Sequence, residues 1–218
     1  MSNTEIAAGL AQGFADVQKF DTPFPYWLSD AFLPDPAIAA LQALRFSTQD
    51  LDGVSGKREL HNASRVYFDV ENQEKHDVCR EFVAAFQSEN IYQLIERTFE
   101  LDLTGSYLRV EFTQDTDGFW LEPHTDLGVK LFTMLIYISD GPGHSEMGTD
   151  IYDLDHNHVG RAPFGPGRGL VFVPSDTSFH GFKPRPIDGI RKSIIINFVT
   201  DEWRAREQLA FPDSPIGV

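Results

Sequence analysis

Three side chains in the second half of the chain have the types and the spacing of a metal site. His124 and Asp126 lie two residues apart in the run EPHTD. A strand places residues two apart on one face, so this imidazole and this carboxylate can reach the same ion. His180 follows 56 positions after His124 (180 − 124), beyond an apolar run, Gly169–Val173, that predicts a buried strand. We therefore predict His124, Asp126 and His180 as metal ligands.

Two neutral imidazoles and one carboxylate fill one face of an octahedral ion and leave three positions open. This is the facial ligand set of non-haem Fe(II) oxygenases. Two open positions suit a bidentate 2-oxo acid and the third suits O₂. The metal and the 2-oxo acid supply the oxidising chemistry, while the protein orients them and excludes water. The ligand set predicts Fe(II) as the cofactor and no catalytic side chain beyond the metal ligands.

A cation for the distal carboxylate of 2-oxoglutarate is also present. Arg191 lies eleven residues after His180 (191 − 180), in the run GIRKS. A guanidinium can donate two parallel hydrogen bonds to a carboxylate, which an ammonium cannot. Ser193 lies two residues further along the predicted strand, so its hydroxyl faces the same side and can donate another hydrogen bond. We predict Arg191 and Ser193 as co-substrate residues.

Composition narrows the classes of partner. The 218 residues include 18 Lys and Arg against 33 Asp and Glu, a net charge of 18 − 33 = −15. Such a charge opposes phosphate backbones and anionic lipids, so we expect neither a nucleic-acid nor a membrane partner, although a local basic cleft stays open. A single cysteine, Cys79, excludes an intramolecular disulfide. With no signal-peptide pattern at the N-terminus, we expect a cytoplasmic protein.

The hydrophobic patterns predict a mainly β fold with flanking helices in a single domain, 1–218. Residues 1–100 form a helical buttress and residues 101–200 the β core. The expected helices are Thr4–Phe20, Asp35–Leu44, Gln73–Phe99 with a break near Asn90, and Glu202–Leu209. The expected strands are Arg65–Val70, Ser106–Phe112, Leu121–His124, Leu131–Ile138, Thr149–Asp153, Gly169–Val173 and Arg191–Val199.

Several motifs in the C-terminal half resemble the Fe(II)/2-oxoglutarate-dependent dioxygenases, most nearly their prolyl 4-hydroxylase-like branch. These motifs are His124–Asp126, Phe132–Ser139, Gly148–Asp150, Phe164–Phe172, His180–Phe182 and Arg191–Ser193. Tyr26–Pro34 also resembles the start of many members. The resemblance implies a double-stranded β-helix, or jelly roll, with His124, Asp126 and His180 on Fe(II) and Arg191 on the 2-oxoglutarate carboxylate. It also implies that the Tyr137 hydroxyl shares that carboxylate.

The sequence departs from the branch at some positions. The link Thr113–Pro123 before the His-X-Asp motif is longer than in many relatives, and Phe112 stands where several have a tyrosine near the co-substrate. Polar Arg109 alternates with apolar neighbours and is a further candidate contact for the substrate or co-substrate. Related halogenases replace the metal-binding carboxylate with a small residue, so the intact Asp126 favours hydroxylation.

Several alternatives stay open. Asp153–His158 is either a second metal site or a solvated hairpin turn, and Thr48–Asn62 is either a substrate lid or an ordinary loop. The expected function is hydroxylation of a C–H bond in a small molecule or peptidyl residue, with release of succinate and CO₂. Nucleic-acid demethylation at the same centre and a non-catalytic jelly-roll binding protein are the alternatives.

Overall fold

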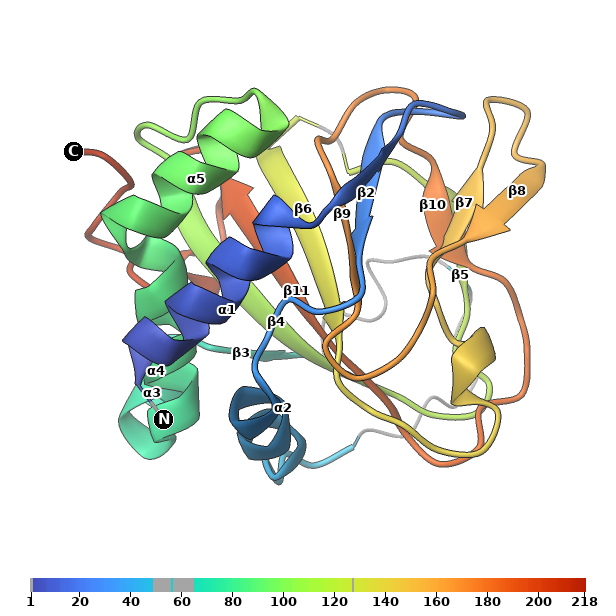
Figure 1. Ribbon diagram of the computed structural model, residues 1–218, viewed down its shortest axis with the longest axis horizontal. Coiled ribbons are helices and arrows are strands. Elements are labelled where there is room, and N and C mark those ends of the chain that lie inside the picture. The colour runs from blue at the N-terminus through green and yellow to red at the C-terminus, as the bar shows by residue number, and fades with distance from the viewer. Residues whose placement is uncertain (1, 49–55, 57–64, 127) are drawn as a thin grey trace.

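Two antiparallel sheets form the body of the molecule in the computed structural model, which describes residues 2–48, 56, 65–126 and 128–218 (Figure 1). The major sheet has the order β1-β2-β9-β6-β11-β4-β3, and the minor sheet β5-β10-β7-β8. The strands of the major sheet are β1 Gln18–Phe20, β2 Tyr26–Ser29, β3 Val66–Tyr67, β4 Tyr107–Asp115, β6 Lys130–Tyr137, β9 Gly169–Phe172 and β11 Arg191–Val199. Those of the minor sheet are β5 Leu121–His124, β7 Asp150–Tyr152, β8 His158–Arg161 and β10 His180–Phe182.

Period-two patterning gives the major sheet two different faces. In β4, β6 and β11 most even-numbered residues, such as Val110, Met134 and Ile196, join the core beneath the helices. The odd-numbered residues point to the space between the sheets. There Leu135, with aromatic residues of both sheets, forms a smaller second core. Many of the other odd positions are polar, as at Thr113, so the inner face of the sheet is where polar chemistry collects.

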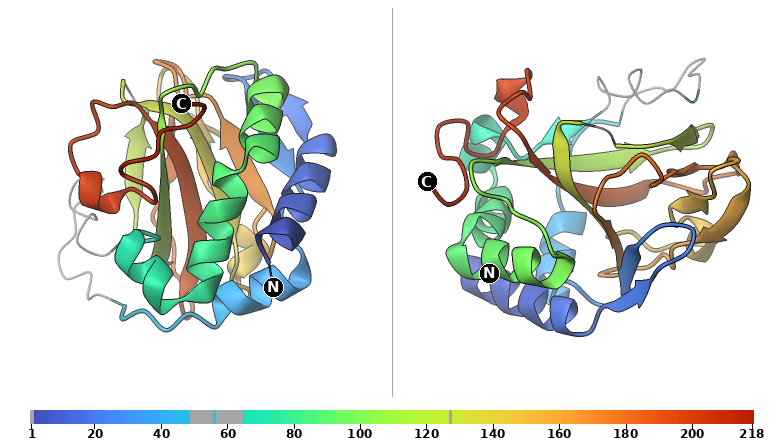
Figure 2. Two further views of the ribbon diagram at one scale, coloured as in Figure 1. Left: turned by 90° about the vertical axis from the view of Figure 1, so that its left-hand side faces the viewer. Right: turned by 90° about the horizontal axis from the view of Figure 1, so that it is seen from above.

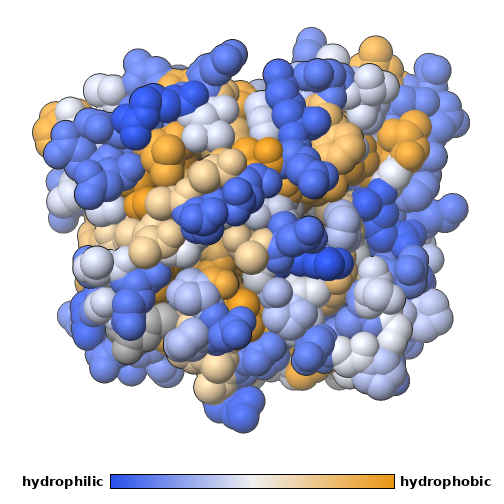
Figure 3. Space-filling view, viewed as in Figure 1, coloured by the Kyte–Doolittle hydropathy of each residue, from blue (hydrophilic) through white to orange (hydrophobic). Residues whose placement is uncertain are grey.

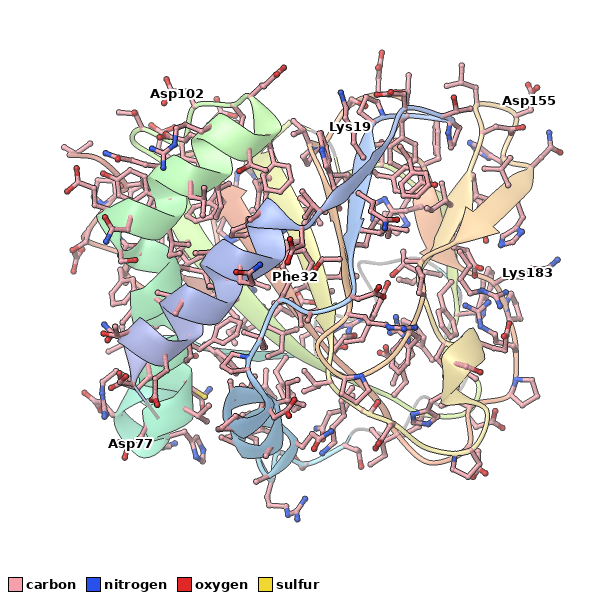
Figure 4. The ribbon with its side chains drawn as sticks, in the orientation of Figure 1. Lys19, Phe32, Asp77, Asp102, Asp155 and Lys183 are labelled. Carbon is pink, nitrogen blue, oxygen red and sulfur yellow. The ribbon has the colours of Figure 1, made fainter. Side chains whose placement is uncertain are left out.

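Helices from the first 100 residues cover the outer face of the major sheet (Figure 2). They are α1 Asn3–Ala15, α2 Asp35–Gln42, α3 Val70–Lys75, α4 Asp77–Gln87 and α5 Glu89–Phe99. Aromatic rings fill the interface: Phe99 lies 5.5 Å from Phe132 of β6 between ring centroids, and Phe32, labelled in Figure 4, lies 5.5 Å from Phe14 of α1. The apolar faces of the helices thus stabilise the sheet that carries the site.

The surface drawn in Figure 3 mixes hydrophilic and hydrophobic residues. Among the described residues, the large hydrophobic side chains that are exposed are Phe20, Val70, Leu154, Val159 and Val218. No helix in the described part of the chain is both long enough and apolar enough to cross a bilayer.

The expected mainly β fold with flanking helices is confirmed, and the bounds of β5 and β11 match the expectation. The first 100 residues, however, also contribute β1, β2 and β3 to the major sheet, so they are more than a helical buttress. The tail expected to be helical over Glu202–Leu209 forms only a 3₁₀ turn at Arg206–Gln208. The candidate lid Thr48–Asn62 lies outside the described residues apart from Thr48 and Gly56.

Other helix boundaries differ from the predicted ones, because the backbone becomes extended at residues that the side-chain periodicity does not mark. The helical stretch over Gln73–Phe99 is interrupted at His76 and at Ser88, both with extended backbone, and not at Asn90. The short strands β8 and β10 were not predicted. Pairing with neighbouring strands defines them, because neither His158–Arg161 nor His180–Phe182 has a run of β-branched or apolar residues that would predict a strand.

Candidate metal centre

Strands β5 and β10 bring the three predicted ligands together. His180 pairs directly with His124 across the two strands, and their ring centroids are 4.4 Å apart. Asp126 follows β5, and its Oδ2 lies 4.0 Å from Nε2 of His180. Gly181 allows this close approach, because a Cβ there would lie only 2.8 Å from the carbonyl oxygen of Leu121. Residues from two strands far apart in sequence thus converge on one point.

Both imidazoles are held in the tautomer that binds metal. Nδ1 of His124 lies 2.9 Å from the carbonyl oxygen of Glu122, and Nδ1 of His180 lies 3.0 Å from that of Ser178. A carbonyl only accepts, so each Nδ1 carries the hydrogen and each Nε2 keeps its lone pair for a metal. Burial, with the neighbouring His124, lowers the pKa of His180 to about 3, which keeps that ring neutral.

The carboxylate of Asp126 is oriented by two donors from β6. Lys130 donates to Oδ1 at 2.7 Å, and the Thr133 hydroxyl donates to Oδ2 at 3.0 Å. Thr133 in turn accepts from Nδ2 of Asn197 at 2.9 Å, and Arg109 donates to Oδ1 of Asn197 at 3.2 Å. This buried chain of hydrogen bonds fixes the orientation of the Asp126 carboxylate relative to His124 and His180.

The three side chains fit a first-row divalent ion. One atom from each of His124, Asp126 and His180 can be chosen so that all lie within 4.8 Å of one another. Ligands at about 2.1 Å from an ion are at most about 4.2 Å apart, so small side-chain shifts close the site. Two imidazoles and one carboxylate are the donor set of a facial Fe(II) site with open positions. The residues therefore fit Fe(II).

A pocket between the sheets runs from the metal ligands to Arg191. Its walls are a mixture of hydroxyl and apolar side chains, among them Thr113, Thr133, Leu135, Thr149, Ser193 and Ile195. Arg191 is buried at the end of this pocket, where its guanidinium lies 4.7 Å from the ring centroid of Phe182. Its Nε donates to the Met147 carbonyl at 2.7 Å, and Nη1 donates to Asp115 at 2.5 Å. The predicted cation therefore lines the pocket but already has a carboxylate partner.

The two hydroxyl residues predicted beside Arg191 differ in position. Ser193 lines the pocket, with its Oγ 2.8 Å from Oγ1 of Thr113. Tyr137 is fully buried, which raises its phenol pKa. Its hydroxyl donates to Oγ1 of Thr149 at 2.9 Å and accepts from the Thr149 backbone N–H. Since Thr149 is the residue that reaches the pocket, Tyr137 positions that threonine.

The fold of the chain matches that of known structures. A prolyl 4-hydroxylase from Pseudomonas putida superposes with a TM-score of 0.57 at 17% identity, covering 89% of this chain and 98% of that one. The chain has the fold of the prolyl hydroxylases. A Trichoplax adhaerens prolyl hydroxylase in complex with a hypoxia inducible factor peptide fragment gives 0.56 at 16%, covering 93% of each chain. A viral collagen prolyl hydroxylase of Paramecium bursaria chlorella virus 1, in a 2-oxoglutarate complex, gives 0.53 at 13%, covering 80% and 96%. No protein-family model and no curated protein matches the sequence.

Arg109, expected to contact the substrate or co-substrate, does not line the pocket between the sheets. Arg109 is fully buried and forms an ion pair with Glu111 at 2.6 Å. Its guanidinium lies 4.7 Å from the ring centroids of both Tyr67 and Trp203, which cover it. The side chain donates to Asn197, which separates it from Thr133 and the pocket. Its role is to hold other side chains in place.

The Asp153–His158 segment forms the hairpin turn between β7 and β8, whose tip carries the labelled Asp155 in Figure 4. Asp153 accepts hydrogen bonds from the backbone N–H groups of Asp155 and Asn157, which closes the turn. His156 packs on Phe179 with ring centroids 4.5 Å apart. These contacts account for the cluster as a hairpin turn.

Sequence reasoning missed two charged residues of the pocket, Arg65 and Asp115. The signal for Asp115 was present, because the odd-numbered residues Arg109, Glu111, Thr113 and Asp115 are polar through a strand whose even positions are mostly apolar. Such period-two polarity indicates a polar inner face. Arg65 had no comparable signal, since it precedes a two-residue strand.

Proposed function

We propose that this chain is an Fe(II)- and 2-oxoglutarate-dependent oxygenase that hydroxylates a C–H bond in a small molecule or peptidyl residue and releases succinate and CO₂. The observation that carries the proposal is the convergence of His124, Asp126 and His180, both imidazoles held through Nδ1, on a pocket whose other end holds Arg191. A bound Fe(II) ion with 2-oxoglutarate supplies the oxidising equivalents for such a reaction.

The residues of the chain have distinct tasks in this proposal. His124, Asp126 and His180 hold the metal, and Thr133 and Lys130 orient the Asp126 carboxylate. Arg191, with the Ser193 hydroxyl beside it, binds the distal carboxylate of the co-substrate. The apolar residues between the two ends, such as Leu135 and Ile195, exclude water from the pocket. A peptide as substrate is supported by the peptide complex of the Trichoplax relative, and a small molecule remains within the proposal.

The test is metal and co-substrate binding followed by turnover. Under anaerobic conditions, Fe(II) and 2-oxoglutarate added to the wild-type protein should give a visible charge-transfer band. His124→Ala should abolish the band. The matched control is His156→Asn, which changes a histidine of the β7–β8 turn and should leave the band unchanged. Asparagine is chosen because His156 has a positive φ of 60°, which asparagine tolerates.

Exposure to O₂ should then produce succinate in the wild type, with a screen of amino acids, prolyl peptides and small metabolites to identify the acceptor. A wild-type protein that gives neither the band nor succinate would refute the oxygenase assignment and favour a non-catalytic jelly roll. Retention of the band in His124→Ala would refute the metal assignment.

A further inference from the structure

The arginine at the end of the pocket already has an internal carboxylate ligand. Strand pairing sets Asp115 of β4 directly opposite Arg191 of β11. Nη1 of Arg191 donates to Oδ2 of Asp115 at 2.5 Å, and Nε donates to the carbonyl of Met147. Both side chains are buried, with 6% and 5% of their surface exposed. An incoming carboxylate thus meets a guanidinium with two of its donor directions in use.

A second arginine completes this group. Arg65 Nη1 lies 3.4 Å from Oδ1 of Asp115, so the carboxylate bridges Arg65 and Arg191, and all three residues line the pocket. Arg65 also pairs with Glu111, 3.4 Å from its Nε, and Glu111 pairs with Arg109 at 2.6 Å. The connected group of three guanidinium groups and two carboxylates has a net charge of 3 − 2 = +1, which a single additional carboxylate would neutralise. Charge therefore favours an anion here, whereas the position of Asp115 opposes one through like-charge repulsion.

The size of the pocket also bears on how a diacid could reach Arg191. The cavity in the pocket has a volume of about 50 Å³, which is room for a few water molecules. Asp115 is the pocket side chain bonded to Nη1 of Arg191, so its displacement would free that guanidinium. It keeps an ionic partner when it moves, because Arg65 holds its other oxygen.

We propose that Asp115 determines co-substrate specificity by competing with the distal carboxylate of the 2-oxo acid for Arg191. The inference rests on the proposed function. The competition has two consequences. It lowers the affinity for a 2-oxo diacid, and it leaves the affinity for a 2-oxo monoacid, which lacks the distal carboxylate, nearly unchanged. The pocket of the wild-type protein therefore discriminates weakly between the two classes, because discrimination is the difference between two affinities.

The experiment compares 2-oxoglutarate with 2-oxopentanoate, which has the same carbon chain and no distal carboxylate. Binding is measured by calorimetry with Mn(II) as a redox-silent metal, on the wild type and on Asp115→Asn. In the wild type we expect a preference for the diacid of less than about tenfold. In Asp115→Asn the preference should rise by at least about tenfold, through tighter binding of 2-oxoglutarate, since the like charge is gone and Arg191 lacks a charged partner.

Three further variants make the test specific. Asp140→Asn removes one exposed carboxylate and should leave the preference at the wild-type value. Asp115→Ser provides a second neutral residue if the asparagine variant does not fold. Adding Arg191→Gln to Asp115→Asn should abolish the gain, because the guanidinium is the group for which the two carboxylates compete.

The outcomes separate this inference from the proposed function. If the wild type binds 2-oxoglutarate and the neutral variants at 115 do not increase the diacid preference, the competition is refuted while the oxygenase assignment stands. A wild-type preference above about a thousandfold would refute the competition without any variant. If neither the wild type nor the variants bind 2-oxoglutarate, both proposals are wrong.

Discussion

The Thr133 hydroxyl offers the sharpest test of how the fold prepares the metal site. Thr133→Val keeps the shape of the side chain and removes the donor to Oδ2 of Asp126, 3.0 Å away. It also removes the acceptor for Nδ2 of Asn197. Loss of an outer hydrogen bond to a metal ligand typically costs ten- to a hundredfold in metal affinity, or about 1.4 to 2.7 kcal/mol. We expect Thr133→Val to weaken Mn(II) binding by that factor.

The matched control is Thr113→Val, the same substitution on the neighbouring wall of the pocket. Thr113 is equally buried, but its hydroxyl bonds to Ser193 at 2.8 Å, and Ser193 is not a predicted metal ligand. Each substitution should lower the free energy of unfolding by about 1 to 3 kcal/mol, because a buried polar partner loses its hydrogen bond. Urea denaturation measures this loss, and calorimetry with Mn(II) measures affinity on the folded protein.

The two measurements together decide whether Thr133 acts on the metal site or only on packing. We expect stability to fall in both variants and metal affinity to fall only in Thr133→Val. Metal affinity within about twofold of wild type in Thr133→Val, or an equal loss in Thr113→Val, would show that the hydrogen bond to Asp126 does not organise the site.

Three other predictions follow from buried groups. Arg109→Met should lower the free energy of unfolding by less than about 3 to 5 kcal/mol in urea denaturation, because Glu111 loses one buried guanidinium partner and keeps Arg65 at 3.4 Å. The affinity for 2-oxoglutarate should not change, and a matching loss of affinity would return Arg109 to the pocket. Burial raises the pKa of the Cys79 thiol to about 12, so iodoacetamide at pH 8 should modify it only in denaturant, and rapid labelling of the native protein would contradict its buried position. Burial alone raises the pKa of Asp150, but hydrogen bonds from the Lys183 N–H and two arginines outweigh it and hold the pKa below its usual range. The stability that this carboxylate contributes is thus present above the ordinary Asp pKa of about 3.9 and is lost as the pH falls through the lower folded-state pKa. The difference in unfolding free energy between wild type and Asp150→Asn should therefore shrink below about pH 4. A difference that stays constant with pH would refute this assignment.

Much of the site could be predicted because its signals are local. The His-X-Asp spacing, the lone His180 beyond a strand and Arg191 at the start of another are readable from periodicity and residue chemistry. The bounds of β5 and β11, which carry His124 and Arg191, were also readable. Alternation of polar and apolar residues tells which side chains share a face, but not how far along that face each one lies. That is why Arg109 was expected at the pocket and lies beyond it.

The sequence by itself therefore determined the identity of the candidate metal ligands and the type of fold, since both follow from short-range patterns of residue type. Only the tertiary structure decided which charges meet. Asp115 faces Arg191 across 76 residues of chain because the register of β4 against β11 sets them opposite each other. No tight turn joins these two strands, so neither strand alone tells which residues of the other it will face. The Nδ1 hydrogen bonds that orient His124 and His180 are likewise made to backbone carbonyls, whose direction depends on the folded strand and not on residue type.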